Sequence, residues 1–452
     1  MKRRVMIVAV LAIVVGALPA IAIGLPSMPS SAFPSSDGCG CHAALLEQWR
    51  PSMHAQALTD PLYLHKLAEG DAATNGAVTP FCLQCHSPIG VMAGEVTALD
   101  HSGASATAAE GVSCSYCHHV TGTNDPIGNA SHQVSPEDIR RAQLTDAQAP
   151  HAWEYSQYHE TAEFCGACHN VNHPANGTHL EATYTEWKAS PYAAEGITCQ
   201  DCHMTPGTGV TKPNPGVAAG GGPEREHIYT MTFTGANVAL GDAAAAEANL
   251  KAAATLELEV PEIVASGDVA VKTTITNVGA GHYLPTGLTE VRQMWLEVVA
   301  TDESGDELLR ERRDFGTVLK GADGSYPVEM WDAVGIQSDD RIPPRESTSN
   351  DYAFAMGTGP VTVTATLYYR SAPEEMAEAA GVDVPTTTMA SASKTVYVSA
   401  EQKEGAVSPD DGTADDAGED TGIDVLLIVG IVAAAVAVAA VAYLLLKKGK
   451  KA

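Results

Sequence analysis

The chain has 452 residues and a formal net charge of −29 at pH 7. This charge excludes nucleic acid and an anionic membrane surface as partners of the folded part, and favours a basic partner protein. The length allows about two or three domains. Only six Phe and five Trp are present, so large aromatic side chains contribute little to any core.

The first 24 residues, MKRRVMIVAVLAIVVGALPAIAIG, combine a basic start with an apolar stretch. Ala20 and Ala22 fit a small-x-small cleavage site, so we expect residues 1–24 to be a signal peptide. An uncleaved membrane anchor is the alternative, because the stretch is about long enough to span a bilayer. In both cases the chain that follows lies outside the cytoplasm.

Five close pairs of cysteines follow, and a histidine comes directly after each pair. The pairs are Cys39/Cys41, Cys82/Cys85, Cys114/Cys117, Cys165/Cys168 and Cys199/Cys202, and the histidines are His42, His86, His118, His169 and His203. Zinc would need two pairs per ion and leave one pair over, and it does not require the histidine. The C-x-x-C-H pattern is typical of haem c, in which two thiols bond to the vinyl groups and the histidine is the proximal iron ligand. The sequence therefore predicts haem c at the four regular motifs.

The first motif reads CGCH, with one residue between Cys39 and Cys41 instead of two. Haem could be held there by Cys41 alone, or by both thiols in a strained loop, or the haem could be lost. Trp49, Ser52 and His54 follow in a pattern that fits haem packing, and we therefore expect a fifth haem at this site.

An internal repeat supports this interpretation. QWRPSMHA (48–55) aligns with EWKASPYA (186–193), so that His54 corresponds to Tyr192. We expect His54 to be a distal iron ligand and Tyr192 to pack against a haem. The favoured candidate distal ligands are His54, His151, His159, His227 and His282, and the histidines held in reserve are His65, His101, His132, His173 and His179.

The segments CLQCHSPIG, GVSCSYCHHVTG, FCGACHNVNHPANG, GITCQDCHM and HIYTMTFTGAN resemble extracytoplasmic multihaem c-type cytochromes. These are related to the tetrahaem electron carrier of nitrifiers and to the haem core of hydroxylamine oxidoreductase. The resemblance covers residues 37–237 and implies closely stacked, bis-histidine haems used for electron transfer. CGCH departs from the family pattern, and no lysine-ligated haem motif is present.

The expected fold class is multidomain. An α-helical, loop-rich multihaem domain (37–237) is followed by a connecting helix (238–254), because LGDAAAAEANLKAAATLEL is rich in Ala. In residues 255–400, runs such as DVAVKTTITNVG and GPVTVTATLYYR alternate apolar and polar residues. This alternation predicts an antiparallel, immunoglobulin-like β-sandwich with Val361, Val363, Ala365 and Leu367 on one face and a turn at DESGDE.

The end of the chain predicts attachment to a membrane. Residues 401–424 are dense in Asp and Glu and lack aromatic residues, so we expect a disordered linker. Residues 425–446 are apolar and uncharged, and residues 447–452 (KKGKKA) are basic. This pattern predicts a transmembrane helix with a cytoplasmic tail, and a single-pass protein whose other domains are extracytoplasmic.

The favoured function is electron transfer by a membrane-anchored cytochrome that exchanges electrons with redox partner proteins. No feature of the sequence identifies the electron donor or the electron acceptor. One alternative is an oxidoreductase that acts on a small nitrogen or sulfur compound at a five-coordinate haem. Another is a subunit of an extracellular haem filament. Electron paramagnetic resonance separates the first two functions, because a haem that lacks a second strong ligand is high-spin.

Overall fold

The computed structural model describes residues 24–407. Residues 24–402 form one compact unit, so the region with the cysteine pairs and the β-rich region belong together. Across residues 24–407, no helix has the length and apolar character needed to span a bilayer. The predicted signal peptide (apart from residue 24), most of the predicted linker, the predicted transmembrane segment 425–446 and the basic tail lie outside the described residues.

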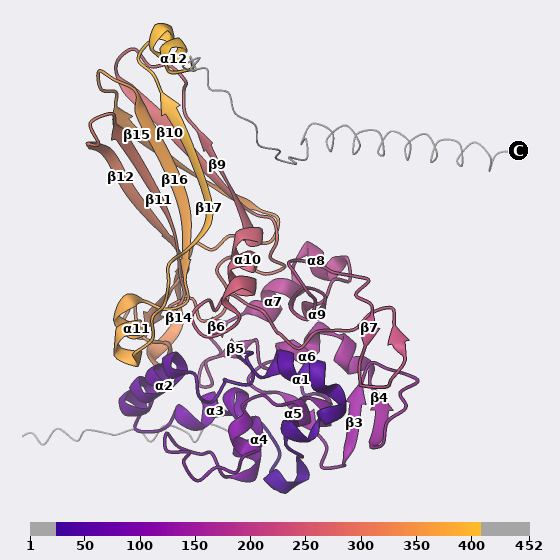
Figure 1. Cartoon of the computed structure of the whole chain (residues 1–452). Helices are drawn as coiled ribbons and strands as arrows, with labels where there is room; N and C mark the ends of the chain where they lie inside the picture. The colour runs from indigo at the N-terminus through magenta and orange to yellow at the C-terminus, as the bar shows by residue number, and fades with distance from the viewer. Residues whose placement is uncertain (1–23, 408–452) are drawn as a thin grey trace, which may run out of the picture. The chain divides into compact units, whose positions relative to one another are not determined.

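Short helices joined by long loops build the N-terminal region (Figure 1). They are α1 (Ala43–Trp49), α2 (Pro61–Thr74), α3 (Thr79–His86), α4 (Pro88–Ala93), α5 (Cys114–His119), α6 (Ala162–Gly166), α7 (Thr183–Lys188), α8 (Pro191–Ala194) and α9 (Cys199–His203). Local signals fix their ends. Before α2, for example, the Asp60 side chain accepts a hydrogen bond from the Leu62 amide at 2.8 Å, and Asn75 ends the helix with φ 53°.

The strands of this region are short and form four two-stranded ribbons. They are β1 (Val120–Thr123) with β2 (His132–Val134), β3 (Ile139–Ala142) with β4 (Ala152–Tyr155), β5 (Val171–Asn172) with β6 (His179–Glu181), and β7 (Gly216–Val217) with β8 (Glu224–Arg225). Only the β3–β4 pair is parallel among them. The region thus has the helical and loop-rich character that the sequence predicts.

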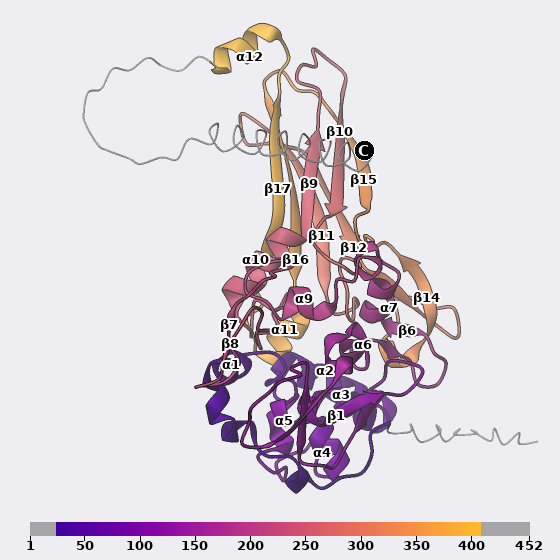
Figure 2. The same cartoon turned by 90° about the vertical axis from the view of Figure 1, so that its right-hand side faces the viewer.

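The β-rich region begins after α10 (Ala243–Ala253), which lies within the predicted connecting helix. Its main strands are β9 (Ala254–Glu259), β10 (Asp268–Asn277), β11 (Gln293–Asp302), β12 (Glu307–Phe315), β15 (Ser347–Ala355), β16 (Val361–Arg370) and β17 (Thr387–Val396). They form two antiparallel sheets, in the orders β15-β10-β9 and β12-β11-β16-β17 (Figure 2). Residues 303–306 connect β11 to β12 as predicted.

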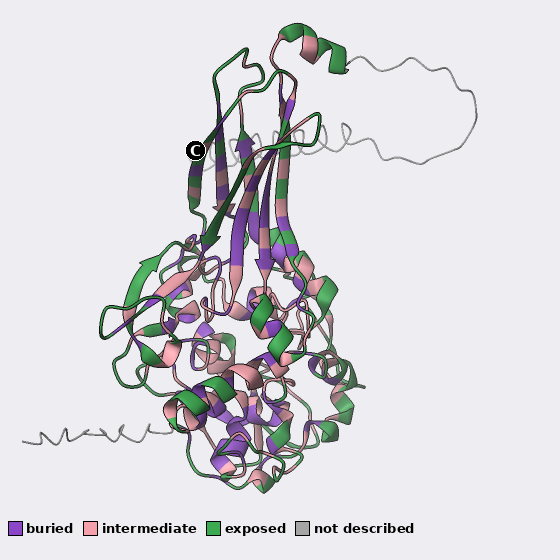
Figure 3. Cartoon of the chain, turned by 90° about the vertical axis from the view of Figure 1, so that its left-hand side faces the viewer, coloured by how far each residue is buried: buried purple, intermediate pink, exposed green. Residues whose placement is uncertain are grey.

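Alternation along the strands builds one core between these sheets. Val361, Val363, Ala365 and Leu367 of β16 are all fully buried, as the sequence predicts, and they belong to one cluster with Val269 of β10. In Figure 3 the strands carry long buried stretches that continue toward the end near the helices. The β-rich region therefore has a hydrophobic core of its own.

Two insertions in the β-rich region contact the N-terminal region. The hairpin of β13 (Thr317–Gly321) and β14 (Ala333–Asp339) packs Leu319 into one cluster with Leu180. Helix α11 (Glu374–Ala380) places Ala377 in a cluster with Leu62 of α2. These contacts explain why one compact unit contains both regions, and the sequence pattern did not reveal them.

The start of the predicted acidic linker differs from expectation. Residues 401–407 belong to helix α12 (Ala400–Val407). The Ser399 hydroxyl accepts a hydrogen bond from the Gln402 amide at 3.2 Å, and the residues that follow are good helix formers. The rest of the linker lies outside the described residues.

Candidate functional site

The five cysteine motifs lie on helical turns. Cys82 and Cys85 are in α3, and Cys199 and Cys202 are in α9. Cys114 is the first residue of α5, and Cys117 lies one turn later in the same helix. N-terminal caps stabilise two of these helices. The Ser113 hydroxyl accepts a hydrogen bond from the Tyr116 amide at the start of α5, and Thr198 forms a capping box with Asp201 at the start of α9. None of the ten cysteines, all of which lie within the described range, forms a disulfide.

The fourth motif follows a similar course, since Cys165 lies in α6 and Cys168 just beyond its end. The irregular first motif forms a 3₁₀ turn, Gly40–His42, immediately before α1. Cys41 is exposed and Cys39 is half-buried. The shorter spacing is therefore accommodated by a tighter turn, with His42 at its end.

The Nδ1 atom of each motif histidine has a hydrogen-bond partner. Four partners are backbone carbonyls: Ala218 for His42 (2.7 Å), Ala57 for His86 (2.9 Å), Arg141 for His118 (2.7 Å) and Thr234 for His203 (2.8 Å). The fifth is a carboxylate, since Nδ1 of His169 lies 3.2 Å from Oε1 of Glu181. Such a partner fixes the proton on Nδ1 and leaves Nε2 available as a ligand.

A second imidazole faces four of these five histidines. The ring centroids are 6.5 Å apart for His42 and His151, 6.0 Å for His118 and His159, 6.2 Å for His169 and His54, and 6.3 Å for His203 and His282. Two metal–nitrogen bonds of about 2.0–2.1 Å, plus about 1.1 Å to each ring centre, give about 6.3 Å. The residues thus fit an iron held between two imidazoles at four sites.

His86 has different surroundings. Its ring stacks face to face on Tyr63, with 3.6 Å between centroids and 3° between the planes. Among residues 24–407, no other histidine ring is found in contact with His86. The Tyr63 hydroxyl is buried without a hydrogen-bond partner. A haem attached to Cys82 and Cys85 would have His86 on one side and no paired imidazole on the other.

The expectation for His227 is not met, because this residue faces no motif histidine. Its ring meets Tyr229 edge to face at 4.6 Å, and its Nδ1 accepts a hydrogen bond from the Asn214 amide at 3.1 Å. The ribbon β7–β8 and its flanking loops hold His227 in this position. Nε2 of His227 is buried without a partner.

Burial keeps facing imidazoles neutral. It lowers the pKa of His54 to about 3 and that of His159 to about 4, so their nitrogen lone pairs are available for a metal. Nε2 of His159 contacts the Cys117 carbonyl at 3.0 Å, and a metal bond through this atom would replace that contact. Desolvation opposes protonation of His169 as well, but the Glu181 carboxylate raises the pKa of His169 to about 9, so a metal that binds Nε2 of His169 would displace a proton.

Contacts between thiols of different motifs give the order of the sites in space. Cys39 of the first motif interacts with Cys114 of the third, and this hydrogen bond lowers the pKa of Cys39 to about 7. Cys85 of the second motif interacts with Cys168 of the fourth, and Cys165 of the fourth interacts with Cys199 of the fifth. The first and third sites are therefore neighbours, and the fourth lies between the second and the fifth.

The internal repeat has one structural role in both copies. The Trp49 indole donates to the Val112 carbonyl at 3.0 Å, and the Trp187 indole donates to the Ile197 carbonyl at 2.8 Å. Each acceptor lies two residues before a motif cysteine. His54 faces His169, whereas the Tyr192 hydroxyl donates to the Val278 carbonyl at 3.1 Å and faces no motif histidine.

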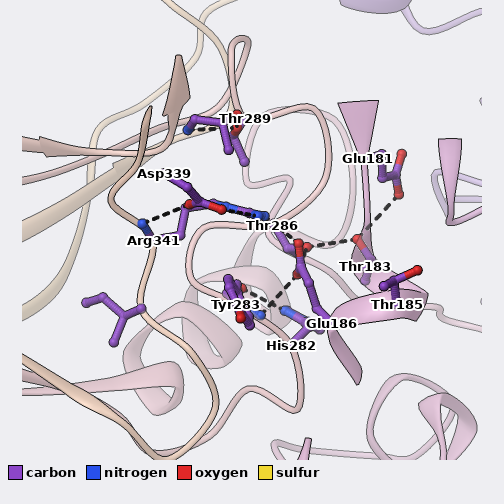
Figure 4. Close-up of polar contacts among 12 residues, drawn as sticks. Glu181, Thr183, Thr185, Glu186, His282, Tyr283, Thr286, Thr289, Asp339 and Arg341 are labelled. Carbon is purple, nitrogen blue, oxygen red and sulfur yellow. Dashed lines mark hydrogen bonds and ion pairs between the residues drawn. The ribbon is translucent and has the colours of Figure 1, made fainter. Parts of the chain in front are cut away.

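The loop that carries His282 is attached to the N-terminal region by a buried ion pair. Glu186 and Arg341 side chains are 4% and 6% exposed and pair directly. Oε2 of Glu186 also accepts hydrogen bonds from the Tyr283 amide at 3.1 Å and the Thr286 hydroxyl at 2.7 Å (Figure 4). The sequence carries no signal for this pair, because 155 residues separate its members.

Two comparisons find similarities to known proteins. Residues 39–119 match the family described as cytochrome c554 and c-prime. A penta-heme cytochrome c552 from Thermochromatium tepidum has a similar fold, with a TM-score of 0.61 and 22% identity over 82% of this chain and 100% of that chain. A putative beta-galactosidase from Bacteroides fragilis reaches a TM-score of 0.17, with 11% identity over 31% of this chain and 15% of that chain. No curated protein matches.

The motifs, the facing imidazoles and the fold define a protein with several covalently attached haems. Residues 39–119 match the cytochrome c554 and c-prime family, the chain has the fold of a penta-heme cytochrome, and the cysteine motifs fit haem c as the cofactor. Proteins of this class transfer electrons, and the polypeptide contributes the ligands, the spacing and the exclusion of water.

Proposed function

We propose that this protein carries electrons through five haems, four of them bis-histidine. The observation that carries the proposal is the 6.0–6.5 Å spacing of four imidazole pairs. Two strong ligands keep a haem iron six-coordinate, which suits electron transfer rather than substrate binding. Bound haem supplies the one-electron chemistry. The polypeptide holds each ligand through its other ring nitrogen.

The thiol contacts support a continuous electron path. They join the first site to the third, and the second to the fourth and fifth. Tyr116, in the third motif, is fully buried and is within electrostatic range of Cys85 and Cys168. The path therefore runs from the first and third sites, past Tyr116, to the second, fourth and fifth.

Two measurements on the purified protein test the number and type of haems. Five covalent haems should appear in the intact mass, including one at Cys39/Cys41, in keeping with the penta-heme neighbour. Electron paramagnetic resonance should show four low-spin haems. A mass without haem, or a majority of high-spin haems, would reject the electron-carrier function.

The surroundings of His86 favour a second function at one haem. Because no imidazole faces His86 among residues 24–407, the iron at Cys82/Cys85 would have an open position for a small nitrogen or sulfur compound. Added cyanide or nitrite should then change the spectrum of one high-spin haem. An oxidised protein with five low-spin haems and no response to these anions would exclude this function.

We further propose that the protein is held in the cell membrane by residues 425–446, with the haem and β regions on the extracytoplasmic side. The support is the apolar stretch and its basic flank. The β-rich region serves as an immunoglobulin-like module, since its sheet orders follow that architecture. Deletion of residues 425–446 should release the protein from membranes, and a variant that stays in the membrane fraction contradicts the anchor.

A further inference from the structure

One motif histidine differs from the other four in the partner of its Nδ1 atom. His169 contacts the Glu181 carboxylate at 3.2 Å, whereas His42, His86, His118 and His203 all contact neutral backbone carbonyls. A carboxylate attracts the Nδ1 proton more strongly than a carbonyl does, and the imidazole then donates more electron density through Nε2. The fourth site therefore has a ligand of different strength from the rest.

The surroundings of Glu181 fix the position of its carboxylate. Glu181 is the last residue of β6 and pairs with Val171 of β5, two residues after His169, and its side chain is 16% exposed. Arg292, from the β-rich region, lies within electrostatic range of Glu181 and is held by a 2.6 Å hydrogen bond to the Ser371 carbonyl. The carboxylate is thus held in place beside His169, with a cation near enough to offset part of the cost of its burial.

Hydrogen bonds also hold Glu181 in a wider network. The Thr183 hydroxyl lies 3.5 Å from Oε1 of Glu181 and 2.8 Å from the Thr286 hydroxyl. Thr286 in turn donates to Glu186 at 2.7 Å (Figure 4). The network leads from the ligand of the fourth site to the loop that bears His282.

We propose that Glu181 makes the haem at Cys165/Cys168 the one with the most negative reduction potential of the five. The negative carboxylate and the stronger imidazole donor both stabilise ferric over ferrous iron. No bond forms or breaks when the electron arrives or leaves. Because the thiols of this motif contact those of the second and fifth motifs, the least reducible haem lies at the junction of the path.

This inference rests on the haem attachment proposed above, and the mass of each variant separates the two questions. Glu181→Gln keeps the size and the hydrogen-bond acceptor but removes the charge. In a spectroelectrochemical titration of the full chain, we expect one potential, the most negative, to shift in the positive direction. Glu181→Asp keeps the charge at a greater distance and should give a smaller shift. Glu257→Gln removes a charge from the exposed surface of β9 and should shift none.

A further variant identifies the haem that responds. Methionine as a ligand raises the potential of a haem relative to histidine, so His54→Met should move the same step as Glu181→Gln, because His54 faces His169. Three results would overturn the proposal. Glu181→Gln could shift a reduction potential other than the one that His54→Met shifts, it could shift all reduction potentials equally, or it could shift none, as expected for Glu257→Gln. If the Glu181→Gln variant does not retain five haems, the titration of the wild-type protein decides. The proposal requires that one haem of the wild type has a reduction potential clearly more negative than the other four.

Discussion

At the scale of single residues, Glu290 is a carboxylate in surroundings that disfavour charge. Both of its carboxylate oxygens are buried without a hydrogen-bond partner. Burial raises the pKa of Glu290 to about 7, and Lys66 and Arg292 offset only part of this effect. An acid whose pKa is raised by folding binds its proton more tightly in the folded state. Its favourable contribution is complete below the unfolded value of 4.5 and is lost as the pH rises through 7.

We therefore predict that Glu290→Gln stabilises the protein at neutral and alkaline pH. The shift from 4.5 to about 7 corresponds to up to about 3 kcal/mol in the free energy of unfolding at about pH 8. Near the unfolded pKa, wild type and variant should be equally stable. Denaturant unfolding at several pH values measures the difference, with Glu257→Gln as the exposed control. A difference that does not change with pH would contradict this explanation.

At the scale of elements, α7 and the loop that bears His282 depend on one buried ion pair. Glu186 of α7 holds the Arg341 guanidinium, the Tyr283 amide and the Thr286 hydroxyl. Arg341 also pairs with Asp339 at 2.8 Å and lies over the Tyr283 ring at 5.0 Å. Loss of Glu186 would leave two donors without their acceptor and the buried Arg341 with Asp339 as its remaining carboxylate partner.

Removal of one partner of a buried ion pair costs about 3–5 kcal/mol, and we predict a destabilisation of this size for Glu186→Ala. Because the His282 loop loses its attachment, part of the haem at Cys199/Cys202 should become high-spin. Thermal unfolding and electron paramagnetic resonance check the two effects.

An exposed ion pair provides the control. Glu195, at the end of α8, pairs with Arg345 of the β-rich region, and both side chains are exposed to solvent. Exposed ion pairs contribute little to stability, so Glu195→Gln should leave both the melting temperature and the spin state close to wild type. Equal losses in Glu186→Ala and Glu195→Gln would contradict a special role for the buried pair.

Sequence patterns predicted the elements whose signals are local. The five motifs, the alternation of β16 and the repeat around Trp49 and Trp187 all act over short distances. The sequence also selected five distal candidates, and the structure brings four of them opposite motif histidines. The prediction for His227 was not met, because nearness in sequence to the last motif does not determine where a side chain points. Here the orientation of the His227 ring depends on its contacts with Asn214 and Tyr229.

Contacts between distant segments could not be predicted in the same way. The pairing of Glu186 with Arg341 joins a helix of the N-terminal region to the end of a β-hairpin, and neither residue stands out in its own segment. Tyr63 likewise lies in an ordinary helical pattern, yet it stacks on His86. These residues acquire their roles through tertiary packing, which the sequence pattern of one element does not report.

At the scale of the whole molecule, the β-rich region completes the last haem site. His282 comes from a loop between β10 and β11, and its ring lies 6.3 Å from that of His203 with 12° between the planes. In the second copy of the repeat, Tyr192 stands where His54 stands in the first, and Gly281 packs closely on Tyr192. The imidazole missing from the repeat is thus supplied by the residue after Gly281.

We predict that His282→Ala converts the haem at Cys199/Cys202 to a high-spin form while all five haems remain attached. The other sites keep their own ligands, so roughly a fifth of the iron should change spin state. Added imidazole should restore the low-spin signal, because it can occupy the space left by the side chain. His227→Ala is the matched control and should leave every haem low-spin that is low-spin in the wild type. If His227→Ala and not His282→Ala produced the high-spin haem, the β-rich region would have no part in ligation and would act only as a structural support.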